Sequence, residues 1–420
     1  MSRFFTRERF GEPQFVAGLL LLIFLAQCVW LVSRRLQTGE LDSDETFVLR
    51  HGLSLWHSRA QASMQRVDVP GHDNSALWDA DQEAAREGMR GSILADPNHS
   101  ALYYLVASAP LLIWPEALDS KSLTTWGWLA HAPMVFFGVM LGASLWYVAR
   151  RLYGNAGGYV ALMLYCFAPG MIRSSALWYA KPEAGAAWGT LGSVFTAIAV
   201  AHTLYAPREV VLWNWRRIVL LGVSLALAIG SQYSLIVLLP LVLGFMLYLA
   251  PERRGAAVAI WTAACGIGLV VLFATYGFRP SAFWQGVREA RLLGYDIQSL
   301  GMWSAYRSLL AELGQICPAL IIAVPAALIG YAFWTRARYF GNTVPLLVAG
   351  LFLLLGLGSP HYPGLGFRLL AIPFLFLFVA GVSSDFMETR YRALAQACAW
   401  GLLAAYATWS LLELARVVRS

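Results

Sequence analysis

Eleven apolar stretches, each close to the length of a membrane span, constrain this chain more than any other feature of its sequence. A helix that crosses the hydrocarbon core of a bilayer needs about 20 apolar residues, with a range of about 17–25. Composition agrees, because 58% of the 420 residues are hydrophobic and only 13% are charged. The sequence therefore excludes a water-soluble globule and predicts an all-α polytopic membrane protein with about 11 transmembrane helices. The expected spans lie near residues 13–33, 126–149, 156–177, 183–204, 217–231, 234–250, 256–277, 315–334, 343–358, 368–386 and 392–414.

The distribution of basic residues predicts which side of the membrane each loop faces. Short cytoplasmic loops carry an excess of Lys and Arg. With the N-terminus in the cytoplasm, the short inner segments hold 14 arginines, whereas the short outer connections and the C-terminal tail hold five basic residues. Arg34 and Arg35 run against this bias, because they follow the first span on its outer side. We therefore expect a multi-pass protein of the plasma (inner) membrane with its N-terminus in the cytoplasm. Because the arginines flank membrane spans, their number does not indicate a nucleic-acid partner.

One outer loop differs from all other connections. Residues 34–125 hold 13 of the 24 carboxylates and four of the seven histidines. The apolar part at residues 100–114 is too short to span, so we expect a helix that lies in the interface or dips back from it. A second outer segment, residues 278–314, interleaves Trp, Tyr, Arg and Glu with apolar residues, which is typical of an interfacial amphipathic helix. The sequence thus predicts one domain, residues 1–420, with its chemistry on the outer face.

The first candidate site follows the first span directly. Asp42, Asp44 and Glu45 place three carboxylates within four positions near the membrane surface. Carboxylates this close raise one another's pKa unless a cation or a hydroxyl donor lies among them. A solvated loop start or a helix N-cap explains the same residues, since Ser and Asp are common capping residues. The spacing by itself leaves both interpretations open.

The second candidate site closes the long outer loop. Pro97 fixes a turn, and either Asn98 or Ser100 is suited to cap the helix that follows. Capping does not require His99, which in a cleft beside Asp44 would bind a hydroxyl or a phosphate group. A lone solvated histidine is the alternative interpretation.

Taken in order along the chain, these motifs resemble the GT-C membrane glycosyltransferases. The resemblance starts from Asp44-Glu45 just outside the first span and a long outer loop that closes on His99-x-x-Leu102-Tyr103-Tyr104. Within that superfamily the chain is most similar to the protein O-mannosyltransferase and lipid A aminoarabinose transferase type, together with bacterial homologues of unassigned substrate. Further matches are Phe167-Ala168-Pro169, Lys181-Pro182-Glu183, Gly230-Ser231-Gln232-Tyr233, and the segment from His361 to Pro373 that includes Arg368.

The sequence departs from the family pattern at three of these places. The usual His-Pro-Pro-Leu is replaced by His99-Ser100-Ala101-Leu102, Glu183 stands where Asp is commoner, and Gln232 takes the place of a frequent Lys. These departures leave the substrate contacts near those positions open.

The resemblance implies a GT-C fold and an inverting transfer of a sugar from a polyprenyl-phosphate carrier to a lipid, glycan or protein acceptor of the cell envelope. It implies Asp44 as the base that deprotonates the acceptor, with Glu45 orienting a partner or sharing that role. The departing phosphate needs cations, which Arg368, His361, Arg279 and Lys181 would supply. Arg368 as a side chain that only snorkels from a helix end is the competing interpretation. The substrate-binding residues expected on this basis are Asn98, His99, Tyr103, Lys181, Glu183, His361 and Arg368.

Other classes of protein make different demands on the sequence. A transporter or lipid flippase places ionisable residues near the bilayer midplane, whereas the few in these spans cluster toward span ends. A structural scaffold leaves the carboxylates at residues 42–45 unexplained. We expect no cofactor. The acidic stretch at residues 68–83 has enough oxygen ligands for a divalent ion but matches no metal-binding loop motif, so a solvated acidic loop is the favoured interpretation and a metal site is the alternative. The sugar, the acceptor and the carrier lipid are not encoded in any motif that the sequence displays.

Overall fold

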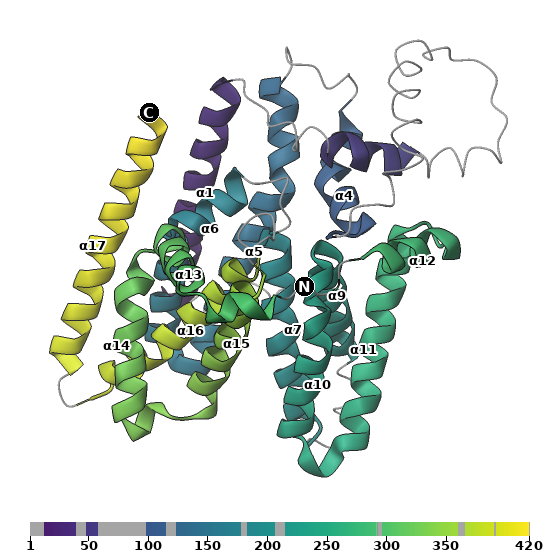
Figure 1. Ribbon diagram of the computed structural model, residues 1–420. Coiled ribbons are helices and arrows are strands. Elements are labelled where there is room, and N and C mark those ends of the chain that lie inside the picture. Colours follow the sequence, from purple (N-terminus) through teal and green to yellow (C-terminus); the bar gives the residue numbers. More distant parts are fainter. Residues whose placement is uncertain are drawn as a thin grey trace, which may run out of the picture. The chain divides into compact units, whose positions relative to one another are not determined.

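In the part of the chain that the computed structural model describes, the regular elements are helices (Figure 1). The structure describes residues 12–38, 48–57, 98–114, 123–177, 183–205, 215–290, 292, 296–359, 366–389 and 392–419. Within these ranges there is no β-strand. The predicted all-α fold class is therefore confirmed for the part of the chain that the structure describes.

The chain divides into two compact units, and two of the four boundaries between them fall inside helices α5 and α7. Unit 1 comprises Met1–Glu40, Met134–Leu191 and Gly294–Ser420. Unit 2 comprises Leu41–Pro133 and Gly192–Leu293. The helices of unit 1 are α1 (Glu12–Thr38), most of α5 (Leu123–Cys166), α6 (Pro169–Ala176), the start of α7 (Glu183–Thr203), η4 (Ile297–Gly301), α13 (Trp303–Ile316), α14 (Ala319–Phe333), η5 (Thr335–Ala337), α15 (Phe340–Leu357), α16 (Phe367–Met387) and α17 (Arg392–Arg419). Unit 2 holds a helix at residues 48–57, α4 (Ala101–Ser108), η1 (Ala109–Ile113), the ends of α5 and α7 that unit 1 lacks, α9 (Trp215–Ser231), η2 (Tyr233–Val237), α10 (Leu238–Leu249), η3 (Pro251–Arg253), α11 (Arg254–Thr275) and α12 (Pro280–Glu289).

Each of the eleven predicted spans coincides with a described helix. Seven helical segments are long and apolar enough to cross a bilayer, and the bent pair α13 and α14, which turn by 111°, brings the number to eight if counted as one span. The predicted spans at 126–149 and 156–177 share α5, which is interrupted at Gly154 with φ at 74°. Helices α9 and α10 are shorter, at 17 and 12 residues. These helices make the chain an integral membrane protein.

Helix α16 forms the core of unit 1. Of its 21 residues, 17 are buried, which is the expected state of a helix that is hydrophobic on all sides. Helices α14, α15 and α17 pack against it. The ring of Phe352 on α15 lies 5.9 Å from that of Phe374 on α16, so aromatic side chains fill the α15–α16 contact.

In unit 2, helices α9 and α11 approach each other closely through small residues. A Cβ atom on Gly222 would lie 2.6 Å from the carbonyl oxygen of Ala264, and one on Gly268 would lie 3.1 Å from the carbonyl oxygen of Gly222. Glycine is therefore needed where the two backbones cross. Helix α10 packs on α11 in the same unit.

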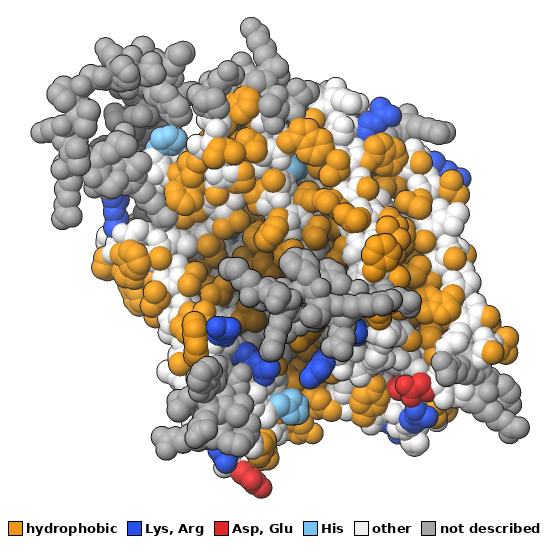
Figure 2. All heavy atoms as spheres, turned by 180° about the vertical axis from the view of Figure 1, so that it is seen from behind, with side chains coloured by type: hydrophobic (Ala, Val, Ile, Leu, Met, Phe, Trp, Pro, Cys, Tyr) orange, Lys and Arg blue, Asp and Glu red, His pale blue; other side chains and the backbone are white. Residues whose placement is uncertain are grey.

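Many large apolar side chains point away from the protein interior. Leu22, Ile322 and Leu402 are 61%, 78% and 72% exposed, each on a span or on the bent pair. Figure 2 shows a face on which hydrophobic side chains dominate and charged ones are few. Exposed apolar surface of this extent is stable in lipid and costly in water.

The two outer segments that the sequence predicts as interfacial have different outcomes. Residues 101–113 are a short apolar helix, α4 followed by η1, as expected. The predicted amphipathic helix at residues 278–314 is instead three pieces, α12, η4 and α13. Pro280 starts α12, and the side chain of Asp296 caps η4 by accepting from the N–H of Gln298 at 2.9 Å. These local signals outweigh the amphipathic pattern that suggested one helix.

Candidate functional site

The predicted site residues fall into three groups in the structure. Asp44, Glu45, Lys181 and His361 lie outside the described residues, as does the acidic stretch at 68–83. Asn98, His99 and Tyr103 belong to unit 2, and Glu183 and Arg368 belong to unit 1. We therefore describe one cluster in each unit.

The unit 2 cluster joins two motifs that lie far apart in the sequence. The backbone N–H of Ser100 donates to the carbonyl of Gly230 at 3.1 Å, and the N–H of Tyr233 donates to the carbonyl of Asn98 at 2.9 Å. Helix α9 ends at Ser231, and the backbone of Gln232 is extended. Asn98 and Ser100 therefore supply hydrogen-bond partners for backbone groups at this helix break. The motif Gly230-Ser231-Gln232-Tyr233 therefore lies at the break between α9 and η2.

Ser100 is the residue that caps α4. Its hydroxyl accepts from the N–H of Leu102 at 3.1 Å and donates to the carbonyl of Gly230 at 2.8 Å. A Cβ atom on Gly230 would lie 3.1 Å from the Ser100 Oγ and 2.6 Å from the Leu102 side chain. The small residue at 230 thus permits the cap to sit against the break.

His99 and Tyr103 pack together at the start of α4. Their ring centroids are 5.0 Å apart, and Tyr103 in turn packs on Tyr104 at 5.1 Å. Tyr103 is buried, with 3% of its surface exposed, while His99 is partly exposed. His99 is therefore the more exposed member of this pair.

Beside this cluster lies an apolar cavity of about 210 Å³. The hydroxyls of Tyr233 and Tyr276, both on its lining, form a hydrogen bond of 2.6 Å. Sequence reasoning missed Tyr276, because nothing near it in the chain indicates that α11 meets the helix break. Other lining residues are Ser100, Leu225, Ile229, Leu272, Phe283 and Val287.

The unit 1 cluster is built around Arg368 in the first turn of α16. Its Nη1 forms an ion pair with Oε2 of Glu312 on α13, and its Nη2 donates to the carbonyl of Gly356 at 3.5 Å. The two charged side chains are only 14% and 23% exposed. A Cβ atom on Gly356 would lie 2.9 Å from Cγ of Arg368, so the arginine stem passes where position 356 has no side chain.

Glu183 joins the same end of α16. It is 2% exposed, and its Oε1 accepts from the backbone N–H of Gly366 at 3.3 Å. Gly366 precedes α16 with φ at 48° and ψ at −128°, a conformation that favours glycine. Two of the recognised motifs, those at residues 181–183 and 361–373, thus meet in unit 1.

The start of α16 combines a helix N-terminus, one guanidinium and two carboxylates. The N-terminus of a helix carries a partial positive charge, so a cation in the first turn costs about 0.3–1 kcal/mol at an exposed site. Arg368 nevertheless stands there, and the carboxylates of Glu183 and Glu312 contact the Gly366 N–H and the guanidinium. A helix N-terminus combined with a guanidinium is suited to bind phosphate, the guanidinium through two parallel hydrogen bonds.

Glu312 is the residue of this cluster that the sequence analysis did not single out. It is the sole carboxylate in the sequence between Asp296 and Asp385. An arginine that opens an apolar span needs a nearby negative partner, so this scarcity was the available signal. Arg279, another predicted cation, is exposed and precedes α12 in unit 2.

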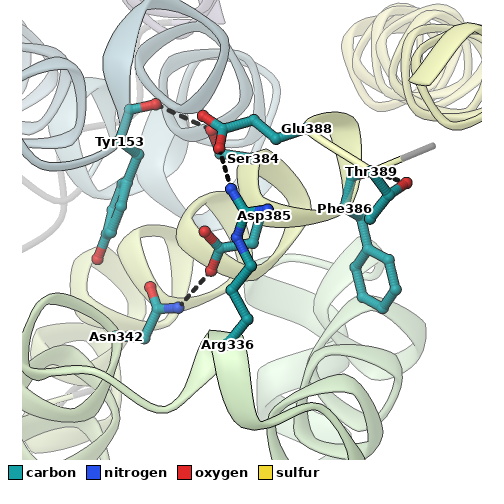
Figure 3. A network of polar contacts seen from close by, with 8 residues as sticks. All are labelled: Tyr153, Arg336, Asn342, Ser384, Asp385, Phe386, Glu388 and Thr389. Atoms are coloured by element: carbon teal, nitrogen blue, oxygen red, sulfur yellow. Dashed lines mark hydrogen bonds and ion pairs between the residues drawn. The ribbon is translucent and has the colours of Figure 1, made fainter. Parts of the chain in front are cut away.

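A second polar network lies at the other end of α16 (Figure 3). Asn342 donates to Oδ2 of Asp385 at 3.0 Å, and Arg336 forms an ion pair with Glu388. Ser384 donates to the carbonyl of Tyr153 at 2.9 Å, next to the interruption of α5 at Gly154. Several of its polar groups pair with one another, which indicates a structural role, although Oδ1 of Asn342 is buried without a hydrogen-bond partner among the described residues. Among the described residues no cluster of three or more His, Cys, Asp or Glu side chains is arranged to hold a metal ion.

Comparison with known proteins gives similarity at the level of structure. No protein-family model matches the sequence, and no curated protein matches it. The chain is similar to the archaeal oligosaccharyltransferase AglB from Archaeoglobus fulgidus in complex with an inhibitory peptide and a dolichol-phosphate, with 13% identity, a TM-score of 0.47, and coverage of 76% of this chain and 47% of that one. For the apo form of the Archaeoglobus fulgidus oligosaccharyltransferase the identity is 13%, the TM-score 0.48 and the coverage 76% and 48%. The chain thus spans about half the length of these oligosaccharyltransferase structures.

Proposed function

We propose that this chain is an inverting glycosyltransferase of the GT-C type. It moves a sugar from a polyprenyl-phosphate carrier to a lipid, glycan or protein acceptor of the cell envelope, on the outer face of the membrane. The order of the motifs along the chain supports this proposal, because the Asp44-Glu45 pair, the loop ending at His99 and the Arg368 segment each precede or open a predicted helix on the outer side.

The observation that carries the proposal is the position of Arg368. Its guanidinium stands in the first turn of α16, only partly exposed and beside Glu312, where a helix end and an arginine add their positive charge. A lipid phosphate must bring its negative charge to the membrane surface, and an unpaired phosphate is costly at low dielectric. A guanidinium that is already withdrawn from water binds such a group strongly.

In this proposal the carboxylate of Asp44 takes the proton from the acceptor hydroxyl. The hydroxyl oxygen forms its new bond to the anomeric carbon from the face opposite the phosphate, so the configuration inverts. The bond between the anomeric carbon and the phosphate oxygen breaks, and the phosphate leaves with the electron pair. Arg368, with His361 and Lys181, neutralises the charge that develops on the leaving group, and Glu45 orients the acceptor.

The location of charged residues favours this function over transport. Glu183 begins α7, Arg368 stands in the first turn of α16, and Asp385 stands in its last turn. A transporter or flippase needs ionisable groups near the midplane, on discontinuous helices. Charges at helix ends are instead suited to chemistry at the membrane surface.

The lipid that co-purifies with the protein tests the proposal. We expect mass spectrometry to identify a polyprenyl phosphate or its glycosylated form in the purified wild type. Asp44→Asn should keep that lipid while lowering sugar transfer by roughly 10²-fold or more, because only proton abstraction is lost. Asp42→Asn, a neighbouring carboxylate, is the matched control and should transfer normally.

Two outcomes contradict parts of this proposal. Near-normal turnover in Asp44→Asn moves the base to Glu45 or out of this cluster. A wild-type protein that retains no polyprenyl lipid and transfers no sugar from one overturns the proposed function itself.

A further inference from the structure

The carboxylate of Glu312 on α13 forms an ion pair with the guanidinium of Arg368 on α16. Glu312 lies on α13, and 56 residues separate it from its partner on α16. Its second oxygen, Oε1, accepts from the hydroxyl of Ser308 one turn earlier on α13 at 3.0 Å. Each oxygen of the carboxylate therefore has its own donor, and the group is fixed on α13 before it meets Arg368.

The arginine is fixed from a second direction as well. Its stem passes over Gly356, and its Nη2 lies 3.5 Å from the carbonyl oxygen of that residue, near the end of α15. A guanidinium has five N–H donors. Among the described residues, Glu312 and Gly356 accept from two of them.

The degree of burial separates this pair from an ordinary surface ion pair. The Arg368 and Glu312 side chains are 14% and 23% exposed, whereas those of Arg336 and Glu388 are 54% and 61% exposed. Exposed pairs add little, because water screens them and long side chains lose entropy when held. A pair withdrawn from water keeps its geometry, since separating the charges leaves one of them unpaired.

We propose that Glu312 is a positioning residue for the donor phosphate: it holds the Arg368 guanidinium so that its remaining N–H groups meet the phosphate in a fixed geometry. This inference builds on the proposed function, since it assigns a partner to the phosphate-binding arginine. Glu312 carries the same sign of charge as the phosphate, so it does not bind the donor itself. Its contribution is the fixed orientation of the guanidinium, which lowers the entropy lost on binding.

The test is a double-mutant cycle on lipid binding in nanodiscs. The probe is a polyprenyl monophosphate, and its Kd is measured for wild type, Glu312→Gln, Glu312→Ala, Arg368→Ala and the variant that combines the last two. We expect Glu312→Ala to weaken binding about tenfold and Glu312→Gln less, because the amide keeps an acceptor oxygen for the guanidinium. The double variant should bind no more weakly than Arg368→Ala, since Glu312 acts through Arg368. Glu388→Gln, in the exposed pair, is the matched control and should bind as the wild type does.

Transfer kinetics distinguish a positioning role from a purely structural one, because the two roles affect KM for the donor and kcat differently. Glu312→Gln should raise KM for the donor and leave kcat within about twofold, because orientation of the phosphate site acts on donor binding. If the Glu312 variants do not fold, Ser308→Ala removes the bond that fixes the carboxylate and keeps both charges, and it should raise the Kd about twofold.

Three results overturn the inference in distinguishable ways. Unchanged or tighter lipid binding in Glu312→Ala, with weaker binding in Arg368→Ala, means that Glu312 competes with the phosphate or serves only the fold. Additive effects in the double variant mean that Glu312 does not act through Arg368. If Arg368→Ala binds the lipid normally, the phosphate site lies elsewhere: this inference fails, and the proposed function loses its assignment of the phosphate to Arg368. A wild type that binds no polyprenyl phosphate removes the proposed function itself.

Discussion

The two ends of α16 carry charges of opposite sign, and each charge has the same sign as the partial charge of its own helix end, which is unfavourable. Arg368 stands at the N-terminus, where the helix dipole is positive, and Asp385 and Glu388 stand near the C-terminus, where it is negative. The ends are roughly 30 Å apart, since α16 has 21 residues with a rise of about 1.5 Å each. Each end must therefore offset an unfavourable charge with groups from other helices.

The ends differ in how they do so. At the C-terminal end, Arg336 and Asn342 contact the two carboxylates, in a network that also ties the α5 interruption to α16 (Figure 3). At the N-terminal end, Glu312 pairs with Arg368, and Glu183 accepts from the N–H of Gly366. The Arg368–Glu312 pair is far less exposed than the Arg336–Glu388 pair at the other end. The difference agrees with a structural role for the C-terminal network and with the phosphate-binding role that we propose for the N-terminal cluster.

Sidedness gives the largest expected contrast between the two ends. We expect Ser75→Cys to react with a membrane-impermeant thiol reagent in whole spheroplasts, because residues 34–125 are predicted to lie outside. Arg253→Cys and Glu388→Cys, the latter at the C-terminal end of α16, should react only after permeabilisation. Cys398 is exposed, so these variants need a Cys398→Ser background. Reversed labelling would place the Arg368 cluster in the cytoplasm and exclude the proposed outward-facing transfer.

Charge removal gives the next contrast. Arg368→Ala should lower sugar transfer by roughly 10²-fold or more, since the leaving phosphate loses its main cation. Arg368→Lys keeps the charge but loses the planar fork, and we expect a loss of about tenfold. Arg336→Ala, at the exposed pair, should leave transfer unchanged, because such pairs contribute only about 0–1 kcal/mol. Wild-type donor affinity in Arg368→Ala would show that Arg368 only anchors a helix end.

Local signals in the sequence were sufficient for the helices and for one part of the site. Apolar length located every described span, and Ser100 caps α4 because a hydroxyl before an apolar run is a local signal. Pro280, after Arg279, was a similar signal for the start of α12, and the amphipathic pattern of the longer segment obscured it. What depends on neighbouring residues along the chain could thus be predicted.

Partners that come from distant segments could not be predicted in the same way. Glu312 contacts Arg368, and Tyr276 contacts Tyr233, although the two members of each pair are 56 and 43 residues apart in the sequence. Hydrophobic periodicity carries no information about contacts at such separations. The motif resemblance indicated that Glu183 and the Arg368 segment belong to one site, but not that a carboxylate accepts from the Gly366 N–H. The roles of Asp44, Glu45, Lys181 and His361 stay predictions, since these residues lie outside the described ranges.

Packing at the C-terminal network gives a smaller effect, on stability. A Cβ atom on Gly381 would lie 1.9 Å from Oδ1 of Asn342 and 2.7 Å from the Tyr153 ring. Gly381→Ala should therefore destabilise the folded protein by about 1–3 kcal/mol, as overpacking does, and lower the thermal midpoint in detergent. Gly350→Ala on α15, where no atom lies within 4 Å of the added Cβ, is the matched control and should not lower it. Equal midpoints in both variants would show that the network tolerates displacement. Transfer per folded molecule should be the same in both.

The smallest effect is a pH dependence confined to the C-terminal end. Burial raises the pKa of Tyr339, which precedes α15, from about 10 to about 12, and the carboxylates of Asp385 and Glu388 add to this while Arg336 opposes it. The folded state holds the phenol proton more tightly than the unfolded chain, so the stabilisation is complete below about pH 10 and is lost as the pH rises toward 12. Tyr339 is 37% exposed, so water screens the effect and we expect it to stay below about 1 kcal/mol.

Tyr339→Phe should therefore lose less stability than wild type between pH 9 and pH 11, measured as the thermal midpoint in detergent. Parallel curves for the two proteins would mean that the phenol of Tyr339 is not coupled to folding, and that the C-terminal network acts through its ion pair and amide contacts alone.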